Sequence, residues 1–169
     1  VINLGFERLD LNTWQGNLKA VPLYKKMGFF WVPGTRVLMQ NYVPAILRYP
    51  VAKEFFNKHP EWYSNMQRHL KVEEDNQEFK GMKIFAYEWQ KDNDILKVTV
   101  DREVFAIAGI EDNRISVMSR PTAHEAPAGF RQKINWEIRN KTKEPFKCSL
   151  LVSSEEGLQI IRKPQETFT

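Results

Sequence analysis

The first thirty residues change from a strand-like to a helix-like hydrophobic pattern. Apolar and polar side chains alternate from Phe6 to Leu11, which is the two-residue period of a β-strand. Apolar residues then recur at helical spacing from Leu18 to Tyr24, and Gly28, which follows two lysines, is typical of a helix end. Pro22 lies within this helical pattern, so we expect a short or bent helix.

A hairpin and a helical segment are predicted next. The segments Phe29–Val32 and Val37–Val43 are strand-like and flank a Pro-Gly pair at residues 33 and 34, which is typical of a turn. A helical pattern follows and is broken at Pro60, which disfavours helical geometry at His59, so we expect two short helices. The apolar members of this pattern are Ala52, Phe55, Phe56, Trp62, Tyr63, Met66 and Leu70.

Beyond residue 80 the pattern consists of short alternating segments separated by turn residues. The clearest runs from Phe130 to Arg139, with the apolar side chains at 130, 134, 136 and 138 on one face. Six or seven such strands with one polar face predict an antiparallel β-sandwich of immunoglobulin-like type. The other segments are 85–89, 96–101, 115–117, 146–152 and 158–161. We expect the sandwich core to contain Trp89, Phe105, Phe130 and Trp136.

The polar, densely charged segment 71–80 indicates a domain boundary. It divides the chain into a mixed unit at residues 1–50, a helical connector at 51–77 and the β-sandwich at 78–169. The predicted fold class is therefore α+β. Val1 opens the chain within a strand-like pattern and its far end stops in an extended-looking segment, so we interpret the chain as a piece of a longer protein.

Composition excludes several classes of function. The 169 residues are 42% hydrophobic and 27% charged, which is typical of a folded protein. The net charge of +4 is mild and the basic residues are interleaved with acids, so neither nucleic acid nor a membrane is an expected partner. Cys148 is the only cysteine and the three histidines lack ligand spacing, so no metal site is expected, and a cytoplasmic location fits best.

The most informative motif is LDLNTWQGNLKAVPLYKKMGF, at residues 9–29. It resembles the C-terminal half of the GNAT superfamily of acyl-CoA-dependent N-acetyltransferases, in which a strand, an Asn-initiated helix with Leu-Tyr and a Gly-Phe pair precede two final strands. The resemblance extends more weakly to about Leu47, or about a quarter of the chain. The matching residues are Asn17, Ala20, Leu23, Tyr24, Lys25, Gly28 and Phe29.

This resemblance implies roles for two residues. Tyr24 would be the general acid that protonates the departing CoA thiolate, and a phenol of pKa near 10 suits that donation. Asn17 would contact acetyl-CoA, whose amides its side chain can both donate to and accept from. The parent protein would then transfer acetyl to an amine of a small molecule or peptide. Taken singly, Tyr24 could instead be a core residue and Asn17 a helix cap.

The loop that holds the CoA pyrophosphate in this family has no counterpart here. Gly5 and Gly16 are isolated, and no Q/R-x-x-G-x-G/A sequence occurs. The chain alone is therefore expected to be a poor or inactive catalyst. The competing hypothesis is a non-catalytic β-sandwich that serves as a binding or interaction module. A strand without its natural neighbour also invites pairing, which suggests self-association into a homo-oligomer.

Overall fold

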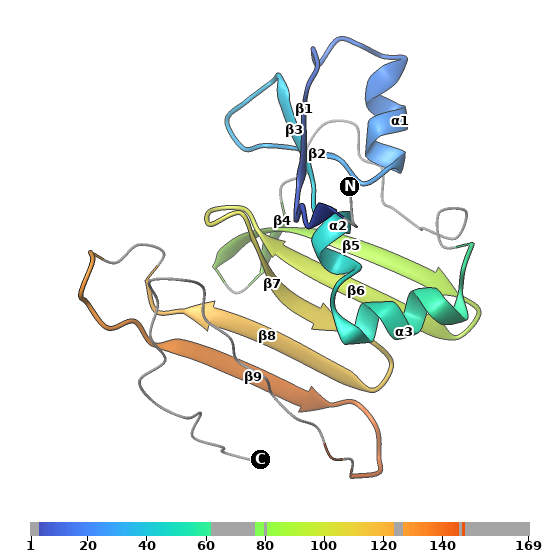
Figure 1. Cartoon of the computed structure of the whole chain (residues 1–169), viewed down its shortest axis with the longest axis vertical. Coiled ribbons are helices and arrows are strands. Elements are labelled where there is room, and N and C mark those ends of the chain that lie inside the picture. Colours follow the sequence, from blue (N-terminus) through green and yellow to red (C-terminus); the bar gives the residue numbers. More distant parts are fainter. Residues whose placement is uncertain (1–3, 62–76, 80, 124–126, 146, 148–169) are drawn as a thin grey trace.

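The computed structural model describes residues 4–61, 77–79, 81–123, 127–145 and 147, which form two antiparallel sheets and three helices (Figure 1). The smaller sheet has the strand order β1-β3-β2, and the larger has β4 to β9 in chain order. The helices are α1 (Ala20–Lys26), α2 (Val43–Ile46) and α3 (Pro50–Lys58). The strands are β1 (Leu9–Asn12), β2 (Phe30–Trp31), β3 (Leu38–Asn41), β4 (Gln77–Phe79), β5 (Met82–Lys91), β6 (Asp94–Asp101), β7 (Ala106–Glu111), β8 (Ile115–Pro121) and β9 (Ile134–Asn140).

The smaller sheet confirms the strand, helix and hairpin predicted for the first fifty residues, except that β3 ends at Asn41 and Val43, predicted as strand, begins α2 before Pro44. β3 is its central strand, and Met39 lies opposite Leu11 of β1 on one side and Trp31 of β2 on the other. Leu9 and Leu11 are half-buried while the residues between and after them are exposed, as the alternation predicts. The strand begins at Leu9 rather than at Phe6, because Leu9 lies opposite Asn41, where its partner strand β3 ends.

Helix α1 is short, as its proline predicts. Pro22 is the third residue of the helix, so its missing N–H falls among the first-turn groups that have no partner within a helix. Gly28 has a φ of +109° and ends the helix, because that backbone conformation disfavours any residue with a Cβ atom. The proline therefore lies in the first turn and does not break the helix.

Helix α3 packs across one face of the larger sheet (Figure 1). Ala52, Phe55 and Phe56 form its buried face, as their spacing predicts. The helix ends at Lys58, and His59 has a φ of −125° and a ψ of 74°, outside the helical region, as predicted from Pro60. The rest of the predicted helical pattern, from Trp62 onward, lies outside the described residues.

The larger sheet is a meander in which each strand pairs with the next one along the chain. Tyr87 lies opposite Val98 and Trp89 opposite Leu96, and all four side chains are fully buried. The predicted alternation of residues 85–89 and 96–100 is therefore confirmed. The residues between them face the other side of the sheet.

One hydrophobic core joins the two sheets through α2 and α3. The smaller sheet contributes Phe30, whose ring stacks on that of Phe85 of β5 with 4.4 Å between centroids. Phe56 of α3 meets the Trp89 ring edge to face at 5.3 Å. The buried members are Phe30, Tyr42, Val43, Ile46, Ala52, Phe55, Phe56, Tyr87, Trp89, Leu96, Val98 and Val100.

The far strands of the larger sheet are less covered than the sequence predicts. Trp89 is buried as expected, but Trp136 of β9 is 39% exposed. Phe130 is 73% exposed and lies in a turn next to Gly129, whose φ is +84°, so β9 begins only at Ile134. Phe105 is also 39% exposed, with a φ of +56° in the turn before β7. The prediction that these three aromatic residues fill the core is therefore wrong.

The described residues have an α+β fold with antiparallel sheets. Of the predicted boundary segment 71–80, residues 71–76 lie outside them, whereas residues 77–79 form β4. Of the strands predicted at 146–152 and 158–161, only residue 147 is described. None of the described helices is long and apolar enough to cross a membrane.

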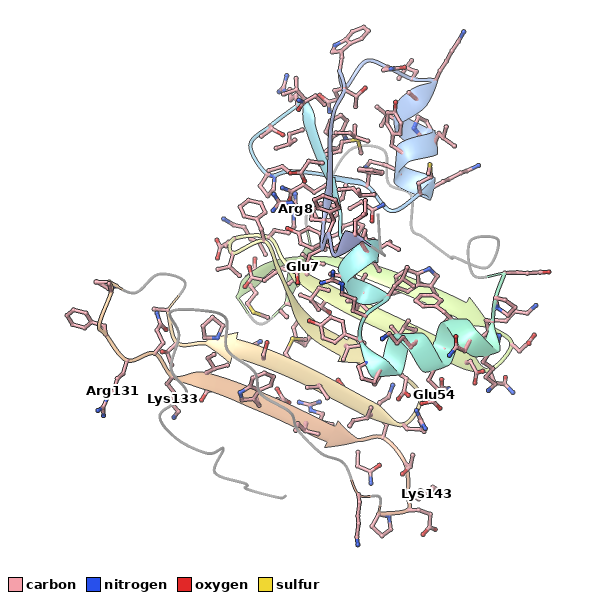
Figure 2. The ribbon with its side chains drawn as sticks, in the orientation of Figure 1. Glu7, Arg8, Glu54, Arg131, Lys133 and Lys143 are labelled. Atoms are coloured by element: carbon pink, nitrogen blue, oxygen red, sulfur yellow. The ribbon has the colours of Figure 1, made fainter. Side chains whose placement is uncertain are left out.

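Figure 2 shows Glu7 and Arg8 where the two sheets meet, with Arg131 and Lys133 before β9 and Lys143 after it.

Candidate functional site around helix α1

Asn17 lies just before α1 and caps it. Its side-chain Oδ1 accepts a hydrogen bond from the Ala20 N–H at 3.2 Å, and its backbone carbonyl accepts one from the Val21 N–H at 3.0 Å. These bonds satisfy two of the free donors at the start of the helix. Its side-chain Nδ2 makes no hydrogen bond to any described residue, so that donor remains available for a ligand.

Tyr24 is the fifth residue of α1 and is half-buried. Its ring meets that of Phe29 edge to face with 6.1 Å between centroids, beside the cluster of buried residues that includes Val21 and Met39. This packing holds the ring in place. The Tyr24 hydroxyl makes no hydrogen bond to any residue that the structure describes, so it has no donor role within this part of the fold.

The end of α1 is held by Asn41 of β3. The Asn41 Nδ2 donates to the Met27 carbonyl at 2.9 Å, and its Oδ1 accepts from the Val43 N–H at 2.8 Å. A Cβ atom on Gly28 would come within 2.9 Å of both side-chain atoms of this asparagine. Glycine is therefore required at position 28 both for its backbone conformation and for the close approach of Asn41.

Tyr87 of the larger sheet joins the same turn to the end of β3. Its side chain is fully buried, and its hydroxyl donates to the Gly28 carbonyl at 2.8 Å and accepts from the Tyr42 N–H at 2.9 Å. Two backbone groups of the first fifty residues are thus satisfied by one side chain from β5. The sequence indicates only that a tyrosine on a buried face needs a partner for its hydroxyl, and it does not identify that partner.

Arg102 makes a second connection of this kind. Its Nη2 donates to the Trp31 carbonyl at 2.8 Å, and its guanidinium lies 5.9 Å from the centroid of the Phe30 ring. The side chain is 3% exposed. Arg102, in the turn after β6, therefore supplies a hydrogen-bond donor to a backbone carbonyl of the edge strand β2. No local sequence pattern predicts this contact.

A groove of about 330 Å³ lies where the two sheets meet. Its polar groups include the Glu7 carboxylate, 3.3 Å from the Arg48 guanidinium, and the Tyr49 hydroxyl. Neither Asn17 nor Tyr24 lines it. The lining residues are Glu7, Tyr42, Ala45, Arg48, Tyr49, Pro50, Phe105, Ala106 and Ile107.

The two tyrosines of this groove stay protonated at neutral pH. Burial raises the pKa of Tyr49 above its usual range, and the nearby Glu7 carboxylate raises it further. Burial also raises the pKa of Tyr42, although the Arg8 guanidinium opposes that shift. The Tyr42 hydroxyl donates to the Phe105 carbonyl at 2.9 Å, which links α2 to the turn before β7.

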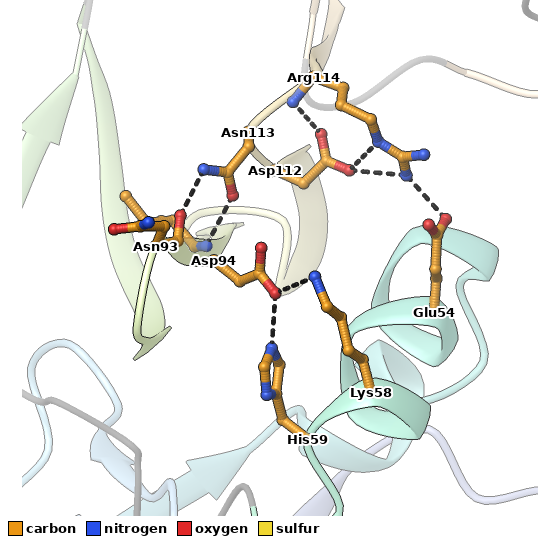
Figure 3. A network of polar contacts seen from close by, with 9 residues as sticks. Glu54, Lys58, His59, Asn93, Asp94, Asp112, Asn113 and Arg114 are labelled. Atoms are coloured by element: carbon orange, nitrogen blue, oxygen red, sulfur yellow. Dashed lines mark hydrogen bonds and ion pairs between the residues drawn. The ribbon is translucent and has the colours of Figure 1, made fainter.

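A polar network connects the end of α3 to two turns of the larger sheet (Figure 3). The Asp94 carboxylate contacts Lys58 Nζ at 2.5 Å and His59 Nε2 at 2.7 Å. The Lys58 ammonium and then the His59 ring lower the pKa of Asp94. In the next turn, the Asp112 carboxylate accepts from the Arg114 side chain, which also reaches Glu54 at 2.7 Å.

This network has a structural role. The Asp112 Oδ1 accepts hydrogen bonds from the backbone N–H groups of Arg114 and Ile115, at 2.7 and 2.8 Å, which identifies Asp112 as a turn residue. Within the described ranges, no group of three His, Cys, Asp or Glu side chains is arranged to hold a metal ion. The network therefore fixes α3 on the sheet.

No family model, curated protein or solved structure matches this chain.

Proposed function

We propose that this chain is the C-terminal part of an acetyl-CoA-dependent N-acetyltransferase of the GNAT type. The observation that carries the proposal is the available Tyr24 hydroxyl on a short helix that lies between a strand and a hairpin. This order of elements is the one that the resemblance of residues 9–29 implies. The available Nδ2 of Asn17, at the start of the same helix, gives further support.

In the proposed reaction, the nitrogen of the acceptor amine attacks the thioester carbonyl carbon of acetyl-CoA. The carbon–sulfur bond then breaks, and the departing thiolate takes the proton of the Tyr24 hydroxyl. The amide nitrogen loses its extra proton to a base, and solvent returns a proton to the tyrosine. Asn17 would bind an amide group of the cofactor through its side-chain N–H while its Oδ1 caps the helix.

The groove between the two sheets suggests how the rest of the chain would contribute. It lies beside the smaller sheet and is lined from both sides of the junction, so the larger sheet would shape access for the acceptor amine. We further propose that the larger sheet belongs to an immunoglobulin-like sandwich. The half-exposed apolar side chains of β9, such as Ile134 and Ile138, support a second covering layer.

Titration calorimetry of acetyl-CoA into this chain, and into a longer protein that contains it, tests the proposal. We expect micromolar binding to the longer protein and little or none to the chain alone. Tyr24→Phe in the longer protein is expected to lower kcat by about 10²-fold or more, which is the usual contribution of a general acid. Lys143→Arg, at an exposed position after β9, is the control and should leave kcat unchanged. An unchanged rate in Tyr24→Phe would remove the general-acid assignment.

A second candidate is a non-catalytic binding or interaction module. The observation that favours it is the apolar surface of β9, where Trp136 and its neighbours on the same face are 39–50% exposed. The unpaired outer edge of β1, within the described part of the sheet, also favours self-association. Absence of acetyl-CoA binding by the longer protein, together with a concentration-dependent mass in sedimentation, would favour this second function.

A further inference from the structure

Arg120, at the end of β8, has two side-chain donors without an acceptor in the described part of the chain. Its Nε and Nη2 atoms are buried, and neither has a hydrogen-bond partner among the residues that the structure describes. Each buried donor left without an acceptor costs free energy, and the cost is larger when the group carries charge. A guanidinium keeps its charge at any ordinary pH, so it cannot avoid this cost by losing a proton.

The same two atoms bind a carboxylate in other arginines of this chain. Arg8 donates from Nε and Nη2 to the two oxygens of Asp10, at 2.8 and 3.0 Å. Arg114 donates from the same pair to Asp112, at 3.2 and 3.0 Å. The Nε and Nη2 donors form a planar fork that matches an oxyanion side-on. In Arg120 the same fork is buried but has no carboxylate partner among the described residues.

The surroundings of Arg120 form an apolar wall on the face of the sheet that turns away from α3. The centre of its guanidinium lies 6.0 Å from the ring centroid of Phe79 in β4, although β5, β6 and β7 separate the two strands in the sheet. The sheet is thus curled so that its first and fifth strands approach each other. The Met118 side chain, two residues before Arg120, lies over Gly109 on the same face.

Contact with an aromatic ring stabilises a guanidinium but does not satisfy its donors. A ring attracts the cation through its face, whereas the N–H groups of the fork point outward in the guanidinium plane. The ring of Phe79 therefore leaves the hydrogen-bonding capacity of Nε and Nη2 unused. The residue directly opposite on β9 is Asn135, whose amide carries no charge.

We propose that Arg120 binds the carboxylate of a small organic acid within the curl of the larger sheet. The planar carboxylate would accept side-on from Nε and Nη2, and its apolar body would lie against Phe79 and Met118. A phosphate group offers similar oxygens but lacks the planar shape and the apolar body. This site is separate from the groove and from α1, and the inference does not depend on the acetyltransferase proposal.

Nitrogen-15 NMR of the Arg120 Nε–H signal, recorded on the whole chain, tests the inference directly. The probes are benzoate, acetate and inorganic phosphate at constant ionic strength. We expect a saturable shift of this signal with benzoate at roughly millimolar concentration and weaker shifts with the other two probes. A saturable shift with phosphate alone would overturn the assignment to an organic acid.

Two variants separate the fork from simple charge attraction. Arg120→Lys keeps the charge but lacks the planar fork, and we expect its affinity for benzoate to fall about tenfold or more. Arg131→Lys changes an exposed arginine before β9 and should leave the affinity unchanged. If Arg120→Lys fails to fold, the wild-type titration decides alone. The proposal would be overturned if Arg120→Lys bound benzoate as tightly as Arg131→Lys does. It would also be overturned if the Arg120 signal of the wild type showed no saturable shift.

Discussion

The hydroxyl of Tyr87 offers the sharpest test of how the two sheets are joined. Its removal in Tyr87→Phe leaves the aromatic ring and its packing against Trp89 in place. Two backbone groups lose their partner, namely the Gly28 carbonyl and the Tyr42 N–H, and both hydrogen bonds are buried. The substitution therefore isolates the hydrogen bonds from the hydrophobic contribution of the ring.

The expected cost follows from these two groups. A buried backbone group left without a partner costs about 1–3 kcal/mol, so the free energy of unfolding should fall by about 2–4 kcal/mol, allowing for some relaxation. A chain of this size loses roughly 2–4 °C of Tm per kcal/mol, so Tm should fall by roughly 5–15 °C. The Tyr87 side chain is fully buried, so water cannot replace the lost bonds without local opening.

Urea unfolding followed by circular dichroism, with a thermal melt, measures this cost. Tyr24→Phe is the matched control, because its hydroxyl makes no hydrogen bond to any described residue, and it should lie within about 0.5 kcal/mol of the wild type. If Tyr87→Phe also lies within about 0.5 kcal/mol of the wild type, the bridging role of this hydroxyl is refuted. A loss of equal size in both variants would refute it as well.

Three further variants test other parts of the fold. Gly28→Ala places a Cβ at a φ of +109° and 2.9 Å from the Asn41 side chain, so it should lower the free energy of unfolding by about 2–3 kcal/mol, measured in urea. In the longer protein, Asn17→Asp keeps the Oδ1 cap but loses the side-chain N–H, so it should preserve Tm and abolish acetyl-CoA binding in calorimetry. Unchanged binding would leave Asn17 only a cap. Asp94→Asn should be less stable than the wild type at pH 7. Because the pKa of Asp94 is lowered, the ionised carboxylate stabilises the fold above the usual pKa of 3.8, and this stabilisation is lost as the pH falls below that value. The difference in unfolding free energy between the wild type and Asp94→Asn should therefore disappear in acid. A constant difference from pH 7 to pH 3 would contradict this origin.

Local rules predict the elements of this fold because they act within a few residues. The alternation at Leu9 and Leu11, the helix end at Gly28 and the disruption before Pro60 all depend on neighbours in the chain. The strand predicted from Phe130 fails for a reason that is also local. Gly129 forms a turn, and the regular alternation begins only at Ile134, so the strand starts four residues later.

The contacts that join the sheets could not be predicted in the same way. Tyr87 is 59 residues from Gly28, and Arg102 is 71 residues from Trp31. A tyrosine or an arginine in a strand pattern indicates that a polar group needs a partner, but many carbonyls could serve. The choice depends on how α2 and α3 place the smaller sheet on the larger one, and that packing arises from the whole core.

For the candidate site, the motif points to Tyr24 and Asn17 but leaves two interpretations of each. The capping bond from Ala20 bears out the local interpretation of Asn17, while its free N–H leaves the cofactor role open to test. The unpaired Nε and Nη2 donors of Arg120 give no sequence signal, because an arginine within a strand pattern is ordinary. What distinguishes it is a pair of buried donors, Nε and Nη2, with no partner among the described residues.

The shared core has a consequence for how the chain folds during synthesis. Phe30, Ile46 and Phe56 leave the ribosome well before the residues that cover them, which extend to Val100 on β6. At about 5–20 residues per second, the 44 residues from Phe56 to Val100 take roughly 2–9 s to be made. During that interval the aromatic and aliphatic face of the early segments has no partner. The nascent chain is therefore expected to depend on chaperone protection until β6 has emerged.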